Sequence, residues 1–148
     1  MRKSKTVVIA AAGRDKGKTF VIREMSARAI EMWALRAFQA LIRGGVELPP
    51  GWMRGGMAEF SKLGLEALFK MQYGEAADLM DDLMSCVQIA RDPKAPTVFS
   101  PIDDEDIEEM GTRIYLKFEV LELHTGFSMA GVREALNSSA PAGDQKTS

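Results

Sequence analysis

Two short apolar runs near the start of the chain are rich in β-branched residues and predict two paired strands. They cover residues 6–12 and 19–24, and a polar linker with glycine at Gly13 and Gly17 separates them. A short glycine-containing linker between two such runs is typical of a β-hairpin. We therefore expect the chain to begin with a hairpin.

After the hairpin, apolar residues recur at helical spacing. Ser26 is the predicted N-cap of a first helix, and Gly44 and Gly45 end that helix. Its apolar face consists of Ala27, Ile30, Trp33, Ala34, Ala37, Phe38 and Leu41. Residues 44–56 are rich in glycine and proline, which disfavour regular structure, so they predict a loop.

Three further helices are predicted at residues 57–71, 75–90 and about 103–123. The short connection between the first two favours an antiparallel pair. The helix predicted at about 103–123 starts with a run of acids, which the positive end of a helix dipole stabilises. Its predicted apolar face consists of Ile107, Met110, Ile114, Phe118 and Leu121.

These elements predict an α+β fold in which an N-terminal β-hairpin packs on a bundle of about four α-helices. A chain of 148 residues suits one domain of ordinary size. We assign this domain to residues 1–136. Residues 137–148 are small and polar, so we expect them to form a flexible tail.

Composition favours a reducing cytoplasm. The one cysteine, Cys86, cannot form an internal disulfide, and the first residues lack the long apolar core of a secretory signal. No stretch approaches the roughly 18 uninterrupted apolar residues that a membrane-spanning helix needs. We therefore expect no membrane role.

Charge is uneven along the chain, although the net charge is only −2. Residues 1–28 carry eight bases and two acids, whereas residues 75–122 carry thirteen acids and four bases. The basic start lacks the interleaved aromatic residues of a nucleic-acid site. A solvated hairpin face or a complementary protein contact is therefore preferred to nucleic-acid binding.

Residues 12–19, AGRDKGKT, satisfy a relaxed phosphate-loop pattern and follow an apolar strand. A working phosphate loop opens a helix whose first N–H groups hold the phosphates. Here the residues after Lys18 have the pattern of a strand, and Ala12 stands where the motif has glycine. We favour a hairpin turn, with a nucleotide-dependent enzyme as the rival hypothesis.

Other candidate sites also have structural interpretations. The acids of residues 103–109 lack the glycine and ligand spacing of an EF-hand, so helix capping is preferred to calcium binding. Cys86 and His124 are too few for a tetrahedral zinc site. Nothing in the spacing favours His124, Ser128 and Glu122 as a catalytic triad. We predict no enzymatic activity and neither a metal nor a cofactor.

Methionines are concentrated in the second and third predicted helices, at Met57, Met71, Met80 and Met84. Their flexible, polarizable side chains suit a surface that adapts to an apolar helix of a partner. Core packing is the alternative for any one of them.

Four segments carry a family resemblance. They read GRDKGKTFVIREMSA, WALRAFQALIRGGVELP, LMDDLMSCVQIARDP and DIEEMGTRIYLKFEVLELHTGF. Together they cover roughly residues 7–128, and their order resembles that of the tail assembly chaperones of tailed bacteriophages.

The resemblance implies a protein that keeps the aggregation-prone tape-measure protein in solution and helps to recruit tail-tube subunits. Such a protein works in the host cell cytoplasm and is absent from the mature virion. The alternative is a structural tail or connector protein that stays in the virion. Association with a second copy of the chain stays open.

No residue-level binding site follows from the resemblance, so we choose candidate partner contacts by their physical character. The apolar candidates are Met57, Phe60, Phe69, Met71, Met80 and Met84. The basic hairpin residues Arg14, Lys16 and Lys18 are a second candidate contact.

Overall fold

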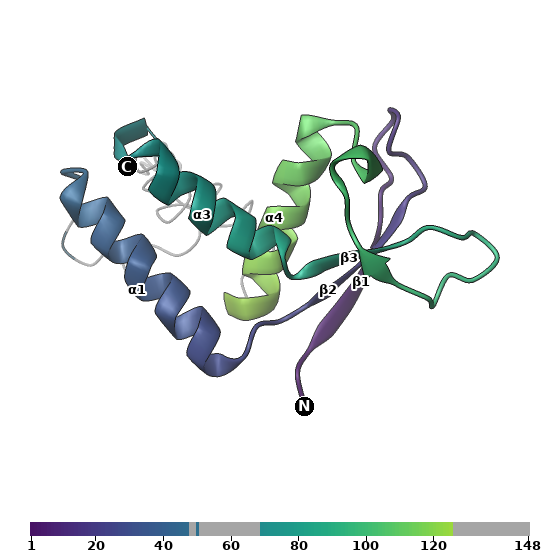
Figure 1. Ribbon diagram of the computed structural model, residues 1–148, viewed down its shortest axis with the longest axis horizontal. Coiled ribbons are helices and arrows are strands. Elements are labelled where there is room, and N and C mark those ends of the chain that lie inside the picture. The colour runs from purple at the N-terminus through teal and green to yellow at the C-terminus, as the bar shows by residue number, and fades with distance from the viewer. Residues whose placement is uncertain (48–49, 51–68, 126–148) are drawn as a thin grey trace, which may run out of the picture.

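The computed structural model describes residues 1–47, 50 and 69–125. In chain order, the elements are strands β1 (Ser4–Val8) and β2 (Thr19–Arg23), helices α1 (Ala27–Arg43) and α3 (Tyr73–Met84), strands β3 (Val87–Ala90) and β4 (Ser100–Pro101), the 3-10 turn η2 (Asp104–Asp106) and helix α4 (Met110–Thr125). Figure 1 shows α1 and α3 side by side at one end of the molecule and the sheet at the other. Helix α4 contacts both α3 and β2.

The four strands form one antiparallel sheet in the order β1-β2-β3-β4. The predicted hairpin is present as the β1–β2 pair, with Val7 opposite Phe20. In its loop the N–H of Gly17 donates to the carbonyl of Ile9 at 2.8 Å, and Gly17 has a positive φ of 87°. Glycine adopts this conformation without the steric cost that a side chain would add. Because β2 also pairs with β3, the hairpin is half of a larger sheet.

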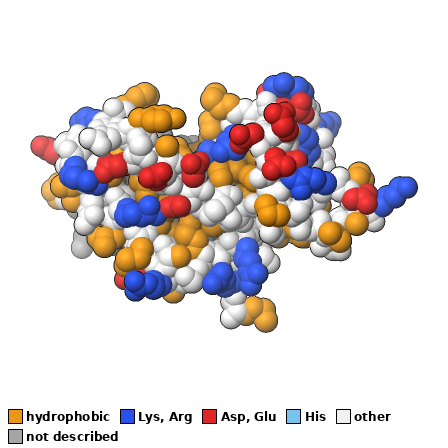
Figure 2. All heavy atoms as spheres, viewed as in Figure 1, with side chains coloured by type: hydrophobic (Ala, Val, Ile, Leu, Met, Phe, Trp, Pro, Cys, Tyr) orange, Lys and Arg blue, Asp and Glu red, His pale blue; other side chains and the backbone are white. Residues whose placement is uncertain are grey.

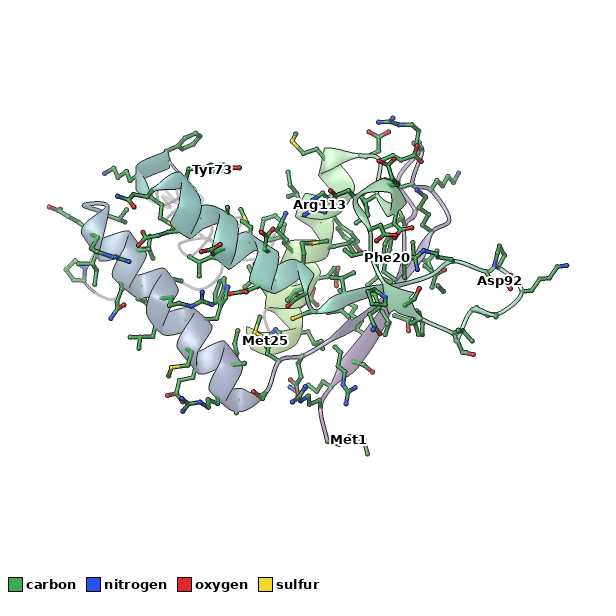
Figure 3. The ribbon with its side chains drawn as sticks, viewed as in Figure 1. Met1, Phe20, Met25, Tyr73, Asp92 and Arg113 are labelled. Carbon is green, nitrogen blue, oxygen red and sulfur yellow. The ribbon has the colours of Figure 1, made fainter. Side chains whose placement is uncertain are left out.

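The core lies between one face of this sheet and the helices. Side chains alternate across the strands, so every second residue faces α4. The buried strand residues are Val7, Phe20, Ile22, Val87 and Ile89, and Leu116 and Val120 of α4 belong to the same cluster. Phe20, Ile22, Leu116 and Val120 are fully buried, and Figure 3 shows Phe20 within the sheet region beside α4.

Helices α1 and α3 are antiparallel neighbours. The predicted N-cap is confirmed, because Ser26 Oγ accepts a hydrogen bond from the N–H of Ala29 at 3.1 Å. The indole N–H of Trp33 donates to the Leu79 carbonyl at 3.0 Å. Surface ion pairs join Arg36 to Asp82 and Arg43 to Glu75. Trp33 of the predicted apolar face thus contacts α3, but the residue of α1 that is buried, Ala40, was not part of that face.

The prediction of a four-helix bundle is wrong. Among the described residues there are three α-helices, and the helix predicted at 75–90 ends at Met84. Val87 and Ile89 are buried while Gln88 is exposed, which is the alternation of a strand. Residues 87–90 pair with β2, and the buried Ile89 and Val87 lie opposite the buried Phe20 and Ile22.

The last predicted helix begins later and buries a different face from the one expected. Helix α4 starts at Met110, so Ile107 precedes it. Met110 and Ile114 of the predicted stripe are exposed, whereas Leu116 and Val120 are fully buried. Apolar residues surround most of this helix, so their spacing does not select one face.

Two sequence predictions fall on residues outside the described ones. The helix predicted at 57–71 does so except for its last residues, and the tail predicted at 137–148 does so entirely. No helix in the described part of the chain combines the length and apolar character needed to cross a membrane.

Candidate functional site

The hairpin loop carries a buried carboxylate. Asp15 is only 1% exposed. Its Oδ1 accepts a hydrogen bond from the N–H of Glu108, and its Oδ2 accepts one from the N–H of Glu109, each at 2.9 Å. These N–H groups lie just before α4, where a helix leaves donors without backbone partners. Asp15 therefore joins the hairpin loop to the residues that lead into α4, which are 93 and 94 positions away in the sequence.

Lys18 is bound by the same cluster. Its Nζ lies 2.8 Å from Asp15 Oδ1 and 3.2 Å from Glu108 Oε2, and it donates to the Asp106 carbonyl at 2.9 Å. Burial by itself would raise the pKa of Asp15, but Lys18, the N–H groups and Thr112 outweigh burial and hold that pKa well below its usual range. Asp15 in turn raises the pKa of Lys18. Both groups are therefore charged at neutral pH.

Two arginines extend the network. Arg14 Nε lies 2.9 Å from Glu109 Oε1. Arg91 binds both carboxylate oxygens of Asp106, at 3.2 Å from Nε and 2.5 Å from Nη2, and lowers the pKa of that carboxyl. Arg91 also donates to the Pro101 carbonyl at 2.7 Å. We call this network the charged corner; it consists of Arg14, Asp15, Lys18, Arg91, Asp106, Glu108 and Glu109.

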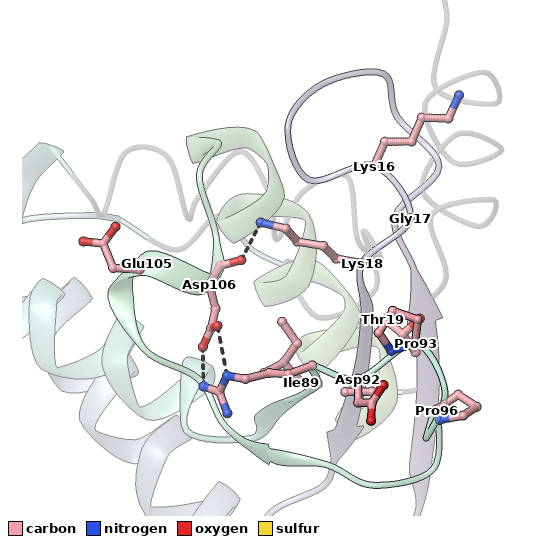
Figure 4. A pocket seen from close by; sticks show the side chains of 12 residues that line it. Lys16, Gly17, Lys18, Thr19, Ile89, Asp92, Pro93, Pro96, Glu105 and Asp106 are labelled. Atoms are coloured by element: carbon pink, nitrogen blue, oxygen red, sulfur yellow. Dashed lines mark hydrogen bonds and ion pairs between the residues drawn. The ribbon is translucent and has the colours of Figure 1, made fainter.

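An open pocket of about 700 Å³ lies beside the charged corner (Figure 4). Its charged lining residues are Lys16, Lys18, Arg91, Asp92, Glu105 and Asp106. Lys18 and Arg91 already bind Asp106, so among the basic lining residues only Lys16 has a side-chain cation without a partner in the described part of the chain. Residues 12–19 also lead into strand β2 and not into a helix. The geometry of a phosphate-binding loop is therefore missing at this segment.

His124 and Cys86 have structural roles in the described region. Nε2 of His124 accepts a hydrogen bond from the N–H of Met25, and Nδ1 donates to the Val120 carbonyl, both at 2.8 Å. Burial raises the pKa of the Cys86 thiol to about 11, which leaves it in the less reactive thiol form at neutral pH. Within the described ranges, no three His, Cys, Asp or Glu side chains are grouped as metal ligands.

Large apolar side chains are exposed where α1 ends and α3 begins. Ile42 is 62% exposed, and Phe69 and Tyr73 are each 87% exposed. These chain segments meet, because a Cβ on Gly44 would lie 3.0 Å from the Lys70 carbonyl oxygen. Figure 3 shows Tyr73 projecting from the end of α3, and Figure 2 shows apolar side chains at that end of the helix pair. We call Ile42, Phe69 and Tyr73 the helix-pair tip.

The apolar residues chosen from the sequence occupy different environments. Met57 and Phe60 lie outside the described residues. Phe69 is exposed at the helix-pair tip, and Met71 and Met80 are half-buried. Met84 is buried in the core cluster, where it packs against other residues of this chain.

The basic candidates also differ from one another. Arg14 and Lys18 hold acids of the charged corner. Lys16 is exposed, and its ammonium group has no partner in the part of the chain that the structure describes.

The sequence interpretation missed two residues of the tip, Ile42 and Tyr73. Ile42 lies outside the apolar face predicted for the first helix, and a large apolar residue off such a face is a signal of exposure. Tyr73 follows the apolar Phe69 by four residues in what reads as a short connection. Asp15 was also missed, since an aspartate between glycines is ordinary turn chemistry.

Comparisons of the chain with protein-family models, curated proteins and solved structures find no match.

Proposed function

We propose that the protein is a tail assembly chaperone of a tailed bacteriophage, which binds the tape-measure and tail-tube proteins while the tail is built. It acts in the host cell cytoplasm and is absent from the mature virion. The order of the four sequence segments supports this assignment, and the exposed helix-pair tip supplies a surface for it.

The helix-pair tip is the observation that carries the proposal. Phe69 and Tyr73 expose most of their surface, and aromatic side chains contribute strongly when a partner covers them. A tape-measure protein is a long, apolar-rich helical chain in the family that the sequence resembles. The apolar face of such a helix can bind to the tip. While it is bound there, it cannot associate with other tape-measure chains.

Co-expression with the neighbouring tape-measure protein tests the proposal. The native chain should move the tape-measure protein from the pellet to the supernatant after lysis. A double variant, Phe69→Ser with Tyr73→Ser, should lose most of this effect. The matched control is Val98→Ser, because Val98 is also apolar and 65% exposed but lies in the β3–β4 connection. An equal amount of tape-measure protein in the supernatant with and without the native chain would contradict the proposal.

Mass spectrometry of purified phage particles separates this function from that of a structural tail or connector protein. A chaperone leaves the particle, so its peptides should be missing while those of the tail-tube protein are abundant. A stoichiometric amount of the chain in the particle would instead support the structural assignment.

A further inference from the structure

Strand β1 is an edge of the sheet in the described part of the chain, because its only strand neighbour there is β2. Hydrogen bonds run from the N–H of Ile9 to the Lys18 carbonyl and from the N–H of Glu24 to the Lys3 carbonyl. Bonded and non-bonded pairs alternate in an antiparallel ladder. The N–H and C=O groups of the intervening residues Ser4, Thr6 and Val8 therefore point away from β2.

The opposite edge of the sheet is protected, which sets the two edges apart. Strand β4 has only two residues, Ser100 and Pro101, and proline has no N–H to donate. Arg91 donates hydrogen bonds to the Pro101 carbonyl and to the Ser100 hydroxyl. Short edge strands and proline both discourage pairing with another chain. Strand β1, with five residues, has neither protection.

A charged side chain that points outward from the edge is another common protection. The one charged residue within β1, Lys5, does not point outward in this way. Nζ of Lys5 lies 2.5 Å from Glu119 Oε2 of α4, and this hydrogen bond raises the pKa of Lys5. Lys5 is thus held on the face of the sheet that α4 covers. The residues whose backbone faces outward, Ser4, Thr6 and Val8, are small, uncharged and exposed.

The charges around the start of β1 favour an acidic partner. Arg2, Lys3 and Arg23 are exposed, and Arg23 lies opposite Ser4 in the register. The nearby acid Glu24 uses Oε1 to accept a hydrogen bond from the Lys3 N–H at 2.8 Å. An added strand with carboxylates near this end would gain attraction as well as backbone hydrogen bonds.

We propose that β1 accepts an extended, acidic segment of a partner polypeptide as a fifth strand of the sheet. The main-chain groups of Ser4, Thr6 and Val8 bind the backbone of that segment, and Arg2, Lys3 and Arg23 bind its carboxylates. This inference does not depend on the proposed chaperone function, because it concerns a different surface from the helix-pair tip.

A synthetic peptide of alternating valine and glutamate, acetylated and amidated at its ends, is the probe, and amide NMR of the full chain is the measurement. The peptide should slow hydrogen exchange at Ser4, Thr6 and Val8. Lys5 and Val7, whose N–H groups already face β2, should change little. Two control peptides should fail: one with N-methyl groups on alternate nitrogens, and one with lysine in place of glutamate.

Two variants test the same edge. Thr6→Pro removes one outward N–H while leaving the bonds to β2, since proline is tolerated on an edge strand, and it should weaken peptide binding about tenfold. Arg23→Glu reverses an exposed charge and should also weaken binding, with an unchanged amide spectrum elsewhere. Equal binding of either control peptide would overturn the proposal, as would protection of Ser4, Thr6 and Val8 in the free protein that rises with its concentration.

Discussion

At the charged corner, nearly every charged side chain has an opposite charge or a backbone group as its partner, whereas at the helix-pair tip large apolar side chains face solvent. The corner joins the hairpin loop to the start of α4 across more than half of the chain. The tip makes no comparable connection, because Phe69 and Tyr73 are almost fully exposed. Stability and binding are therefore expected to depend on different regions of the molecule.

Replacing the buried carboxylate of the corner should have the largest effect on stability. Asp15→Ala leaves the N–H groups of Glu108 and Glu109 and the ammonium group of Lys18 without their buried acceptor. Lys18 keeps Glu108 and the Asp106 carbonyl as partners, so most of the loss comes from the two N–H groups, and together these unsatisfied donors cost about 3 kcal/mol. The free energy of unfolding, measured by urea denaturation, should fall by about that amount.

A neighbouring residue supplies the control for this variant. Lys16 is exposed in the same loop, so Lys16→Ala should change the free energy of unfolding by less than about 0.5 kcal/mol. If Asp15→Ala proves as mild as Lys16→Ala, the corner does not stabilise the fold, and the contrast with the tip is lost.

Acid should weaken the corner selectively. The unfolded chain protonates Asp15 near its ordinary pKa of 3.8, while the folded chain does so only at lower pH because its pKa is lowered. The unfolded state therefore binds more protons in between, and the stabilisation by Asp15 is complete above pH about 4 and lost as the pH falls further. The difference in unfolding free energy between the native chain and Asp15→Asn should shrink from pH about 5 to pH about 2. If this difference stays constant with pH, the stabilisation does not depend on the ionised form of the Asp15 carboxylate.

Local sequence patterns were sufficient for the parts of the fold that depend on neighbours in the chain. The hairpin follows from two β-branched runs and a glycine-containing linker. The first helix follows from its N-cap Ser26, its helical spacing of apolar residues and the glycines at its end, and the structure has a helix from Ala27 to Arg43 with Ser26 and Gly44 as its caps. In each case the residues that decide the conformation lie within a few positions of one another.

Patterns failed where a distant segment decides the structure. Val87 continues the helical spacing of Leu83, and only pairing with β2 makes residues 87–90 a strand. Helix α4 is apolar around most of its circumference, so the packed neighbours and not its periodicity select the buried face. Asp15 reads as a turn residue until the fold brings it to the N–H groups before α4. The charged corner could not be predicted for the same reason.

His124 offers a smaller test, at the end of α4 away from the corner. Its ring links the Met25 N–H to the Val120 carbonyl, so His124→Leu removes both hydrogen bonds and leaves a partly buried N–H without an acceptor. An unsatisfied group of this kind costs about 2 kcal/mol. Thermal unfolding should show the loss, and His124→Gln should restore part of it because its amide has both an acceptor and a donor. Equal stability of all three chains would mean that the ring does not connect these elements.

The helix-pair tip should contribute least to stability. Phe69 and Tyr73 are exposed, so replacing both with serine removes little packing, and surface changes of this kind alter the free energy of unfolding by no more than about 0.5 kcal/mol. The same double variant is expected to lose most of its effect on the tape-measure protein. Urea denaturation and co-expression of this one variant thus measure separately what the tip contributes to stability and to binding. A loss of stability as large as that of Asp15→Ala would mean that Phe69 and Tyr73 pack in solution, and the tip would then be part of the fold and not a surface kept open for a partner.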